Sequence, residues 1–411
     1  MMTEQRQREA RSDPRAEPDE ALITKIRGRY PVERELDRVL TRKMRLRSSP
    51  GYRALPLEDL AQGTASLIRS EIGDDFALLN PRWLQGGASK LQMAFDLDWQ
   101  PPGARDRQVT RMVLRMEPPA SIVETSRARE FEVLQLVKDA VPVPPCFWVD
   151  IEGSHLPFPA LIYGFVEGTT KPTARISQTV SGIGTNFGPE LRAVLAEQFV
   201  ANLVAVHTID EARLAQLQHF DAAEVGSNSA IIRQINGWRR IWEEDRFEDS
   251  PLIEVIAEWL IENAPTLDRV SLVHGDFRTG NFLFSETSEK ITAWLDWELA
   301  ALGDRHQDLS WVTGSHFGHY AEDGKTFLAC GLMPVDEFLP RYEQLSGLTV
   351  DPKKLQFFRI FNDFQGVVTM LGAAWRVARH GKTHQDVVVA WLSMLGQVIL
   401  GNLRDRLEEL L

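Results

Sequence analysis

A short stretch in the second half of the chain gathers polar side chains at a spacing that can do chemistry. Asp276 is followed two residues later by Arg278 and five residues later by Asn281. A second carboxylate, Asp296, comes after a further apolar run. Carboxylate and amide oxygens are the ligands that Mg²⁺ takes from proteins, and a carboxylate can accept the proton of an attacking hydroxyl. Phosphoryl transfer requires this set of groups.

The apolar runs on either side of residues 285–290 predict a β-hairpin. In the expected register Leu283 pairs with Trp294, and Asn281 lies opposite Asp296. Opposed residues have Cβ atoms about 5 Å apart, so an amide oxygen and a carboxylate would converge at one end of the hairpin. The alternative is a hairpin whose Asp and Asn residues only cap turns. The spacing, the hairpin and the further carboxylate together favour the functional interpretation.

These positions suggest a role for each side chain. Asp276 would accept the proton of the attacking hydroxyl or orient that hydroxyl, and Arg278 would neutralise charge on the transferred phosphoryl group. Asn281 and Asp296 would bind Mg²⁺. His274 is expected to brace the loop rather than to take part in the reaction.

The same segment resembles a known family. It contains His-Gly-Asp at 274–276, Asn281, Leu-Asp-Trp-Glu at 295–298, Gly303-Asp304 and Asp308-Leu309. This run is similar to the motif of aminoglycoside phosphotransferases and choline-kinase-like enzymes, which are relatives of protein kinases. Arg233-Gln234-Ile235 with Trp238, and Arg341-Tyr342-Glu343, resemble the branch attached to some acyl-CoA dehydrogenases. The resemblance covers most of residues 80–380 and implies ATP and Mg²⁺ as cofactors, with Asp276 as catalytic base.

The resemblance also implies a phosphate-covering turn and a cation on a neighbouring strand. Gly86, Gly87 and Ser89 precede a predicted strand, and the two glycines would let the backbone approach phosphates closely. A plain hairpin turn explains these residues equally well. Arg115 stands where the family has its phosphate-pairing cation, and an arginine offers bidentate phosphate contacts. The alternative for Arg115 is a strand residue with a solvated tip.

Two further predictions complete the nucleotide half. Glu130 is the expected partner of Arg115, because it shares a helical face with apolar residues and an unpaired inward carboxylate would be costly. Glu132 is the second choice. The strand that ends at Tyr163, Phe165 and Val166 would be the hinge, whose backbone would bond the adenine edge.

The surrounding elements predict an α+β, two-lobed, protein-kinase-like fold with a small β-rich N-lobe and a larger helical C-lobe. We expect strands at 91–97, 109–116 and 160–166 and helices at 23–46, 57–72 and 125–139. The predicted parts are an N-terminal extension (1–55), a nucleotide-binding N-lobe (56–165) and a catalytic, acceptor-binding C-lobe (166–411). The extension is expected to start with a disordered, charged arm that reaches to about residue 22.

Composition limits the function classes. The 411 residues carry a formal net charge of −12, which disfavours non-specific nucleic-acid binding and docking to an anionic membrane. The N-terminus has no apolar signal region, and Val387–Leu403 is expected to be a buried C-terminal helix rather than a membrane span. A cytoplasmic location follows as an expectation. The oligomeric state is left open.

The predicted function is transfer of the γ-phosphoryl group of ATP to a hydroxyl of a small molecule. The branch resemblance implies a hydroxyacyl compound or its CoA thioester as acceptor. An aminoglycoside-type antibiotic phosphotransferase is the first alternative, and a catalytically silent nucleotide-binding pseudokinase is the second. Protein kinase activity is disfavoured, because the sequence lacks Asp-Phe-Gly and Ala-Pro-Glu signatures with an activation segment between them.

Overall fold

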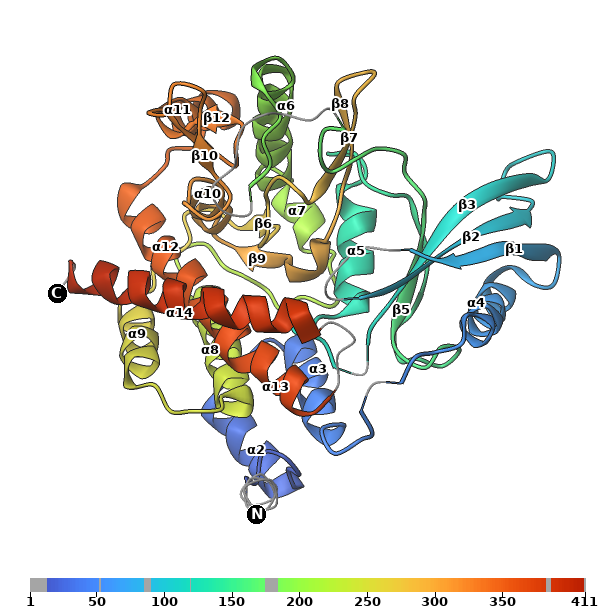
Figure 1. Ribbon diagram of the computed structural model, residues 1–411, viewed down its shortest axis with the longest axis horizontal. Coiled ribbons are helices and arrows are strands. Elements are labelled where there is room, and N and C mark those ends of the chain that lie inside the picture. Colours follow the sequence, from blue (N-terminus) through green and yellow to red (C-terminus); the bar gives the residue numbers. More distant parts are fainter. Residues whose placement is uncertain are drawn as a thin grey trace.

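The computed structural model describes residues 13–51, 53–84, 90–118, 120–173, 184–381 and 386–409. Figure 1 shows a small lobe built on a twisted sheet and a larger helical lobe beside it. This α+β arrangement confirms the fold predicted from the sequence. Among the described residues, no helix combines the length and apolar character that crossing a membrane demands.

One antiparallel sheet forms the small lobe, with strand order β1-β2-β3-β5-β4. Its strands are β1 (Phe76–Trp83), β2 (Leu91–Trp99), β3 (Gln108–Met116), β4 (Cys146–Asp150) and β5 (Ala160–Gly164). Helix α4 (Leu57–Ile72) covers one face of this sheet (Figure 1) through Leu60, Leu67 and Ile68. These helix residues share an apolar core with Met93 and Phe95 of β2.

Helix α5 (Arg127–Val137) lies between the two lobes (Figure 1). Ser126 caps its N-terminus, because its hydroxyl accepts a hydrogen bond from the N–H of Arg129. The apolar side chains Val133, Leu134 and Val137 belong to the core of the large lobe. This helix therefore joins the sheet to the large lobe.

The large lobe is mainly helical. Its helices are α6 (Pro189–His207), α7 (Glu211–Leu214), α8 (Ser229–Asp245), α9 (Pro251–Glu262), the 3₁₀ turn η1 (Trp297–Leu299), α10 (His306–Val312), α11 (Val335–Ser346), α12 (Pro352–Val367), the π-helical turn η2 (Val368–Ala373), α13 (Ala374–Arg379) and α14 (Asp386–Glu408). Its short strands are β6 (Ser271–Val273), β7 (Phe282–Ser285), β8 (Lys290–Trp294), β9 (Ala301–Gly303), β10 (His319–Tyr320), β11 (Phe327–Ala329) and β12 (Met333–Pro334).

The hairpin β7–β8 forms as predicted, but its register is one residue different. Phe282, not Leu283, pairs with Trp294, and a bulge between Leu283 and Phe284 changes the register again. The N–H of Leu295 donates to the carbonyl of Asn281 at 2.8 Å, so Asn281 faces Leu295 and not Asp296. The prediction was wrong from the turn onward, because Ser285 pairs with Lys290, whereas the predicted register would pair it with Thr292. The bulge adds one residue on the β8 side and reduces this difference from two residues to one.

The N-terminal extension contains two helices where the sequence analysis predicted one. Helix α2 (Glu20–Arg29) and helix α3 (Arg34–Arg45) are separated at Pro31, which cannot continue a helix. The disordered arm was predicted to reach about residue 22, which extends too far along the chain. The Asp13 carboxylate pairs with Arg15 at 3.0 Å, and α2 begins before residue 22.

The C-terminal helix α14 is only partly buried. Ile399 and Leu403 pack into the large core, whereas Trp391, Met394 and Val398 are exposed. The expectation of a buried helix is therefore wrong for one face. An amphipathic helix laid on the surface of the core explains both sets of side chains.

Candidate active site

Asp276 lies in the loop after β6, with its carboxylate held by three donors. Oδ1 accepts hydrogen bonds from Nε of Arg278 at 2.8 Å and from Nε1 of Trp311 at 2.9 Å. Oδ2 accepts one from Nδ2 of Asn281 at 2.6 Å. The carboxylate is thus fixed in one orientation while its side chain remains about one-fifth exposed, as a group that must meet a substrate requires.

A buried carboxylate holds the backbone of this loop. Asp308, at the start of α10, accepts the N–H of His274 at 2.7 Å and the N–H of Gly275 at 2.9 Å. His207 of α6 contacts the same carboxylate at 3.2 Å, and Asp308 has no exposed surface. Burial lowers the pKa of His207 despite this contact, so its imidazole is neutral at pH 7.

Gly275 brings the loop of Asp276 against the loop of Asp296. Its φ of +81° lies in the left-handed region that favours glycine. A Cβ atom built on it would lie 2.7 Å from the carbonyl oxygen of Leu299. His274 joins the same two segments, because its Nε2 contacts the carbonyl of Leu295 at 3.0 Å. The expected bracing role of His274 agrees with this position.

The two predicted metal ligands lie next to each other along this junction. Asn281 is buried and donates through Nδ2 to the backbone carbonyl and the carboxylate of Asp276, so its amide oxygen is the remaining side-chain ligand atom. Asp296 follows Leu295, which is hydrogen bonded to Asn281. Its φ of +59° turns the chain at the end of β8, and its carboxylate is 41% exposed.

Arg115 of β3 joins the sheet to this site. Its Nη1 contacts the carboxylate of Asp296, and its Nη2 lies 3.0 Å from Oε2 of Glu298. The predicted partner Glu130 lies 3.7 Å from Nη1, but its closest cation is Arg127. The second choice, Glu132, instead accepts the backbone N–H groups of Gln218 and His219.

Arg115 belongs to a buried network of charged side chains that crosses the lobe boundary. The side chain of Arg127 is fully buried and contacts Glu117 at 2.9 Å and Glu298 at 3.1 Å. Lys90 contacts the same two carboxylates, at 2.9 and 3.3 Å. Burial would raise the pKa of Glu298, but the charges of Lys90, Arg115 and Arg127 hold it well below its usual range. Its charge is therefore permanent at neutral pH.

The sequence analysis assigned no role to the residues that build this network. Arg127, Glu117 and Lys90 were not selected, and Glu298 was noted only as the last residue of the Leu-Asp-Trp-Glu motif. Arg127 shares a helical face with Glu130, three residues later in α5, but Glu117 directly follows β3 and carries no such signal. Their partners lie far away in sequence, since Arg127 and Glu298 are separated by 171 residues.

The remaining predicted nucleotide contacts are only partly described. Gly86, Gly87 and Ser89 lie outside the described residues. Tyr163 is the penultimate residue of β5, and burial raises its pKa to about 12. Phe165 donates its N–H to the carbonyl of Arg111 at 2.9 Å. Adenine contacts from this segment would therefore use the Phe165 carbonyl and the backbone of Val166.

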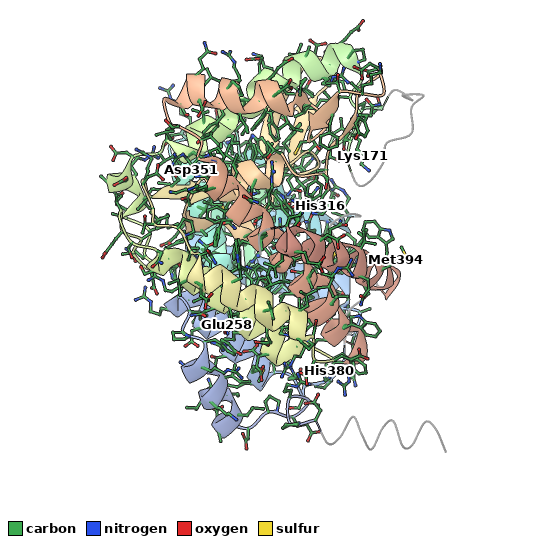
Figure 2. The ribbon with its side chains drawn as sticks, turned by 90° about the vertical axis from the view of Figure 1, so that its left-hand side faces the viewer. Lys171, Glu258, His316, Asp351, His380 and Met394 are labelled. Carbon is green, nitrogen blue, oxygen red and sulfur yellow. The ribbon has the colours of Figure 1, made fainter. Side chains whose placement is uncertain are left out.

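Beyond Asp276, a second group of polar side chains continues along α10, α12 and α14. The indole of Trp311 lies 6.2 Å from the ring of His316. His316 contacts Oδ1 of Asp363 at 2.9 Å, and Arg406 contacts Oδ2 at 3.3 Å. In the view of Figure 2, His316 lies between Lys171, above it, and Met394 on α14, below it.

Comparison with known proteins identifies the family. The sequence model described as "Phosphotransferase enzyme family" matches residues 103–354, which is more than half of the chain. The chain belongs to this phosphotransferase enzyme family. It is therefore a phosphotransferase, as the sequence predicted. The match begins between β2 and β3, so the N-terminal helices precede the part that the family shares.

Relatives and solved structures of this phosphotransferase agree with the resemblance. "Probable acyl-CoA dehydrogenase IBR3" of Arabidopsis thaliana is 26% identical over 282 residues, which is 64% of this chain and 33% of that protein. Human "Acyl-CoA dehydrogenase family member 11" is 26% identical over 267 residues, 62% of this chain and 32% of that protein. The chain thus spans about a third of the length of these relatives. A structure from Ralstonia eutropha, described as an aminoglycoside phosphotransferase, shares the fold with a TM-score of 0.55, 22% identity and coverage of 83% of this chain and 98% of that one.

Proposed function

We propose that this phosphotransferase moves the γ-phosphoryl group of ATP to a hydroxyl of a small anionic molecule, with a hydroxyacyl compound or its CoA thioester as the first choice. The observation that carries the proposal is the grouping of Asp276, Asn281 and Asp296 at the junction of two loops. The N-lobe presents Arg115 to the same junction. A cation from the sheet and oxygen ligands from the C-lobe are the parts that phosphoryl transfer needs.

The donor atoms at this junction suit a magnesium nucleotide. Mg²⁺ takes oxygen ligands and usually one or two carboxylates; the Asp296 carboxylate and the amide oxygen of Asn281 would hold it. The Nε atom of Arg115 is buried and has no hydrogen-bond partner, which fits an anionic ligand close by. When bound, the magnesium nucleotide supplies the transferable phosphoryl group.

The side chains around Asp276 support the role of catalytic base. Two donors to Oδ1 and one to Oδ2 fix the plane of the carboxylate, so an acceptor hydroxyl meets a preorganised group. Asp276 would orient that hydroxyl and take its proton as the new P–O bond forms. Arg278 would neutralise charge on the transferred group.

The charge on the acceptor side favours an anionic acceptor. Both oxygens of Asp363 are engaged, one by His316 and the other by Arg406. Burial and the nearby charge of Arg406 lower the pKa of Arg359, while the charge of Asp363 acts in the opposite direction. Two positively charged arginines thus lie near one carboxylate. A carboxylate or phosphate group would balance this excess, whereas a polycationic aminoglycoside would be repelled.

The test is a panel of acceptors with MgATP, read by product mass spectrometry. It contains hydroxyacyl-CoA thioesters, free hydroxy acids, choline and aminoglycosides. The expected result is phosphorylation of an anionic hydroxy compound, and the Asp276→Asn variant should lower kcat by about 10²- to 10⁴-fold. Turnover of free hydroxy acids would indicate that the enzyme recognises a carboxylate, whereas turnover of CoA thioesters would indicate that it recognises the phosphates of CoA. Turnover of aminoglycosides alone would reject the anionic acceptor.

A matched pair of variants tests the charge argument on its own. Arg406→Gln should raise the KM of the anionic acceptor about tenfold. Arg404→Gln should leave KM unchanged, because Arg404 lies on the same helix but pairs with the exposed Asp405. The pseudokinase alternative predicts nucleotide binding without turnover of any acceptor in the panel. Calorimetry of ATP with and without EDTA tests the metal ligands.

A further inference from the structure

Helix α3 of the N-terminal extension spans the boundary between the two lobes. At its N-terminal end it contacts α5, and along its length it contacts α8 of the large lobe. Figure 1 shows α3 beside α8, below α5 and away from the sheet. The region matched by the family model starts 58 residues after the last residue of α3. The function of this helix is therefore not given by the family.

The contacts with α5 are short, charged and buried. Glu35 accepts a hydrogen bond from the hydroxyl of Ser126 at 2.5 Å, and Ser126 is the N-cap of α5. Glu33 contacts Nη2 of Arg129, in the first turn of α5, at 2.6 Å. Both glutamates are at most 6% exposed. A hydrogen bond to a charged group is worth more than one between neutral groups, so these two contacts hold the start of α5.

The other side of α3 is fixed to α8 by a second set of buried ion pairs. Lys43 contacts Glu244 at 2.6 Å and Asp245 at 3.1 Å, and Arg47 contacts Asp245 at 2.5 Å. Burial would raise the pKa of Asp245, but the positive charges around it lower that pKa strongly. Leu40 adds an apolar contact, since it lies in the core of the large lobe. The helix is thus anchored on the C-lobe and reaches across to α5.

A pocket lies between α3, α8 and the loop of Asp276. Its cavity volume is about 90 Å³, and its walls include Leu36 and Val39 of α3, Trp238 of α8 and Gly275 of the loop of Asp276. The apolar face of α3 thus leaves some space beside this loop. The polar contacts of α3 with α5 therefore contribute more to holding the two helices together than they would in a solidly packed interface. The two glutamates supply direct polar contacts between α3 and α5.

We infer that α3 is a strap that positions α5 and, through it, the charge network around Arg115. Helix α5 carries Arg127, which contacts Glu298, and Glu130, which contacts Arg115. A displacement of α5 would move these charges away from the nucleotide phosphates expected at Arg115. Glu33 and Glu35 are thus positioning residues that touch neither substrate nor metal. The inference rests on the proposed nucleotide site.

The test compares the Glu33→Gln, Glu35→Gln double variant with Glu20→Gln. Glu20 lies in the same extension and pairs with the exposed Arg45; within the part of the chain that the structure describes, it makes no ion pair with α5. We measure hydrogen exchange of the α5 amides and, by calorimetry, the Kd of a non-hydrolysable MgATP analogue. In the double variant, α5 exchange should accelerate and the Kd should rise about tenfold, while the melting temperature shows that the protein remains folded. Glu20→Gln should change neither.

Two results would overturn the inference. Unchanged α5 exchange in the double variant would mean that α3 does not hold this helix. Faster exchange with an unchanged Kd would mean that the position of α5 does not matter to the network. If the double variant fails to fold, the single Glu35→Gln variant replaces it with the same two readouts. A wild-type protein that binds no nucleotide would instead reject the proposed function, and the exchange measurement would still decide the strap.

Discussion

The buried carboxylate of Asp308 offers a direct test of how the catalytic loop is held. In Asp308→Asn, one side-chain oxygen is replaced by an NH₂ group, so the N–H of His274 or of Gly275 loses its acceptor. Leaving a buried donor unsatisfied costs about 1–3 kcal/mol, and the lost charge weakens the bond that remains. A total of about 3 kcal/mol corresponds to a factor of roughly 100 in the opening equilibrium of the loop.

Hydrogen exchange read by mass spectrometry measures this opening at the peptide that contains His274 and Gly275. We expect those amides to exchange about 100-fold faster in the variant, with kcat lowered at least tenfold because Asp276 lies in the same loop. Asp323→Asn is the matched control. Asp323 also accepts two backbone N–H groups, of Lys325 and Thr326, but on the exposed surface. Normal exchange at residues 274–275 in Asp308→Asn would refute the argument that this carboxylate holds the loop.

Other measurements test the electrostatics of the fold. Burial would raise the pKa of Asp304, but the contacts of His306 and Lys354 lower it to about 2. The contribution of this carboxylate to the stability of the folded protein is therefore present above pH 3.8 and is lost as the pH falls towards 2. Lys354→Met should therefore shift acid unfolding, followed by circular dichroism, to higher pH. Arg115→Lys should weaken MgATP binding about tenfold in calorimetry, since one ammonium cannot replace two guanidinium contacts. Burial raises the pKa of Cys330 to about 12, so iodoacetamide at pH 8 should label this thiol only after unfolding; labelling of the folded protein would contradict the burial.

The catalytic segment was predictable because its information is local. Asp276, Asn281 and Asp296 lie within 21 residues, and a hairpin between them leaves few ways to separate their side chains. The hairpin was identified from its apolar runs, but its register was not. The bulge at Leu283 depends on how the hairpin packs against its surroundings, and the sequence pattern carries no sign of it.

The charge network was not predictable for the opposite reason. Arg115 was selected by resemblance, yet its contacts are with Asp296 and Glu298 of the other lobe. Only the packing of α5 between the lobes brings Arg127 into the same group. Hydrophobic periodicity predicts which face of a helix is buried, but it does not predict which distant charge that face will meet.

In the N-terminal extension, local sequence signals predicted helical structure but not its tertiary contacts. Helix formation around residues 23–46 was predicted, and Pro31 explains why the helix is interrupted. The contacts of Glu33 and Glu35 with α5 were not predicted, because charged residues on an amphipathic helix usually face water. Burial of such residues is the observation that only the structure provides.

The close contact at Gly275 couples the two halves of the active site. The backbone of the base-bearing loop touches Leu299 with no room for even a methyl group. A side chain at this position would push apart the loops that carry Asp276 and Asp296, so the proposed proton acceptor and the proposed metal ligand would be displaced together. A backbone shift in one of these loops therefore cannot change the position of one group without moving the other. A change of acceptor preference that keeps both groups in place is therefore expected to come from surfaces away from this crossing, such as α12 and α14.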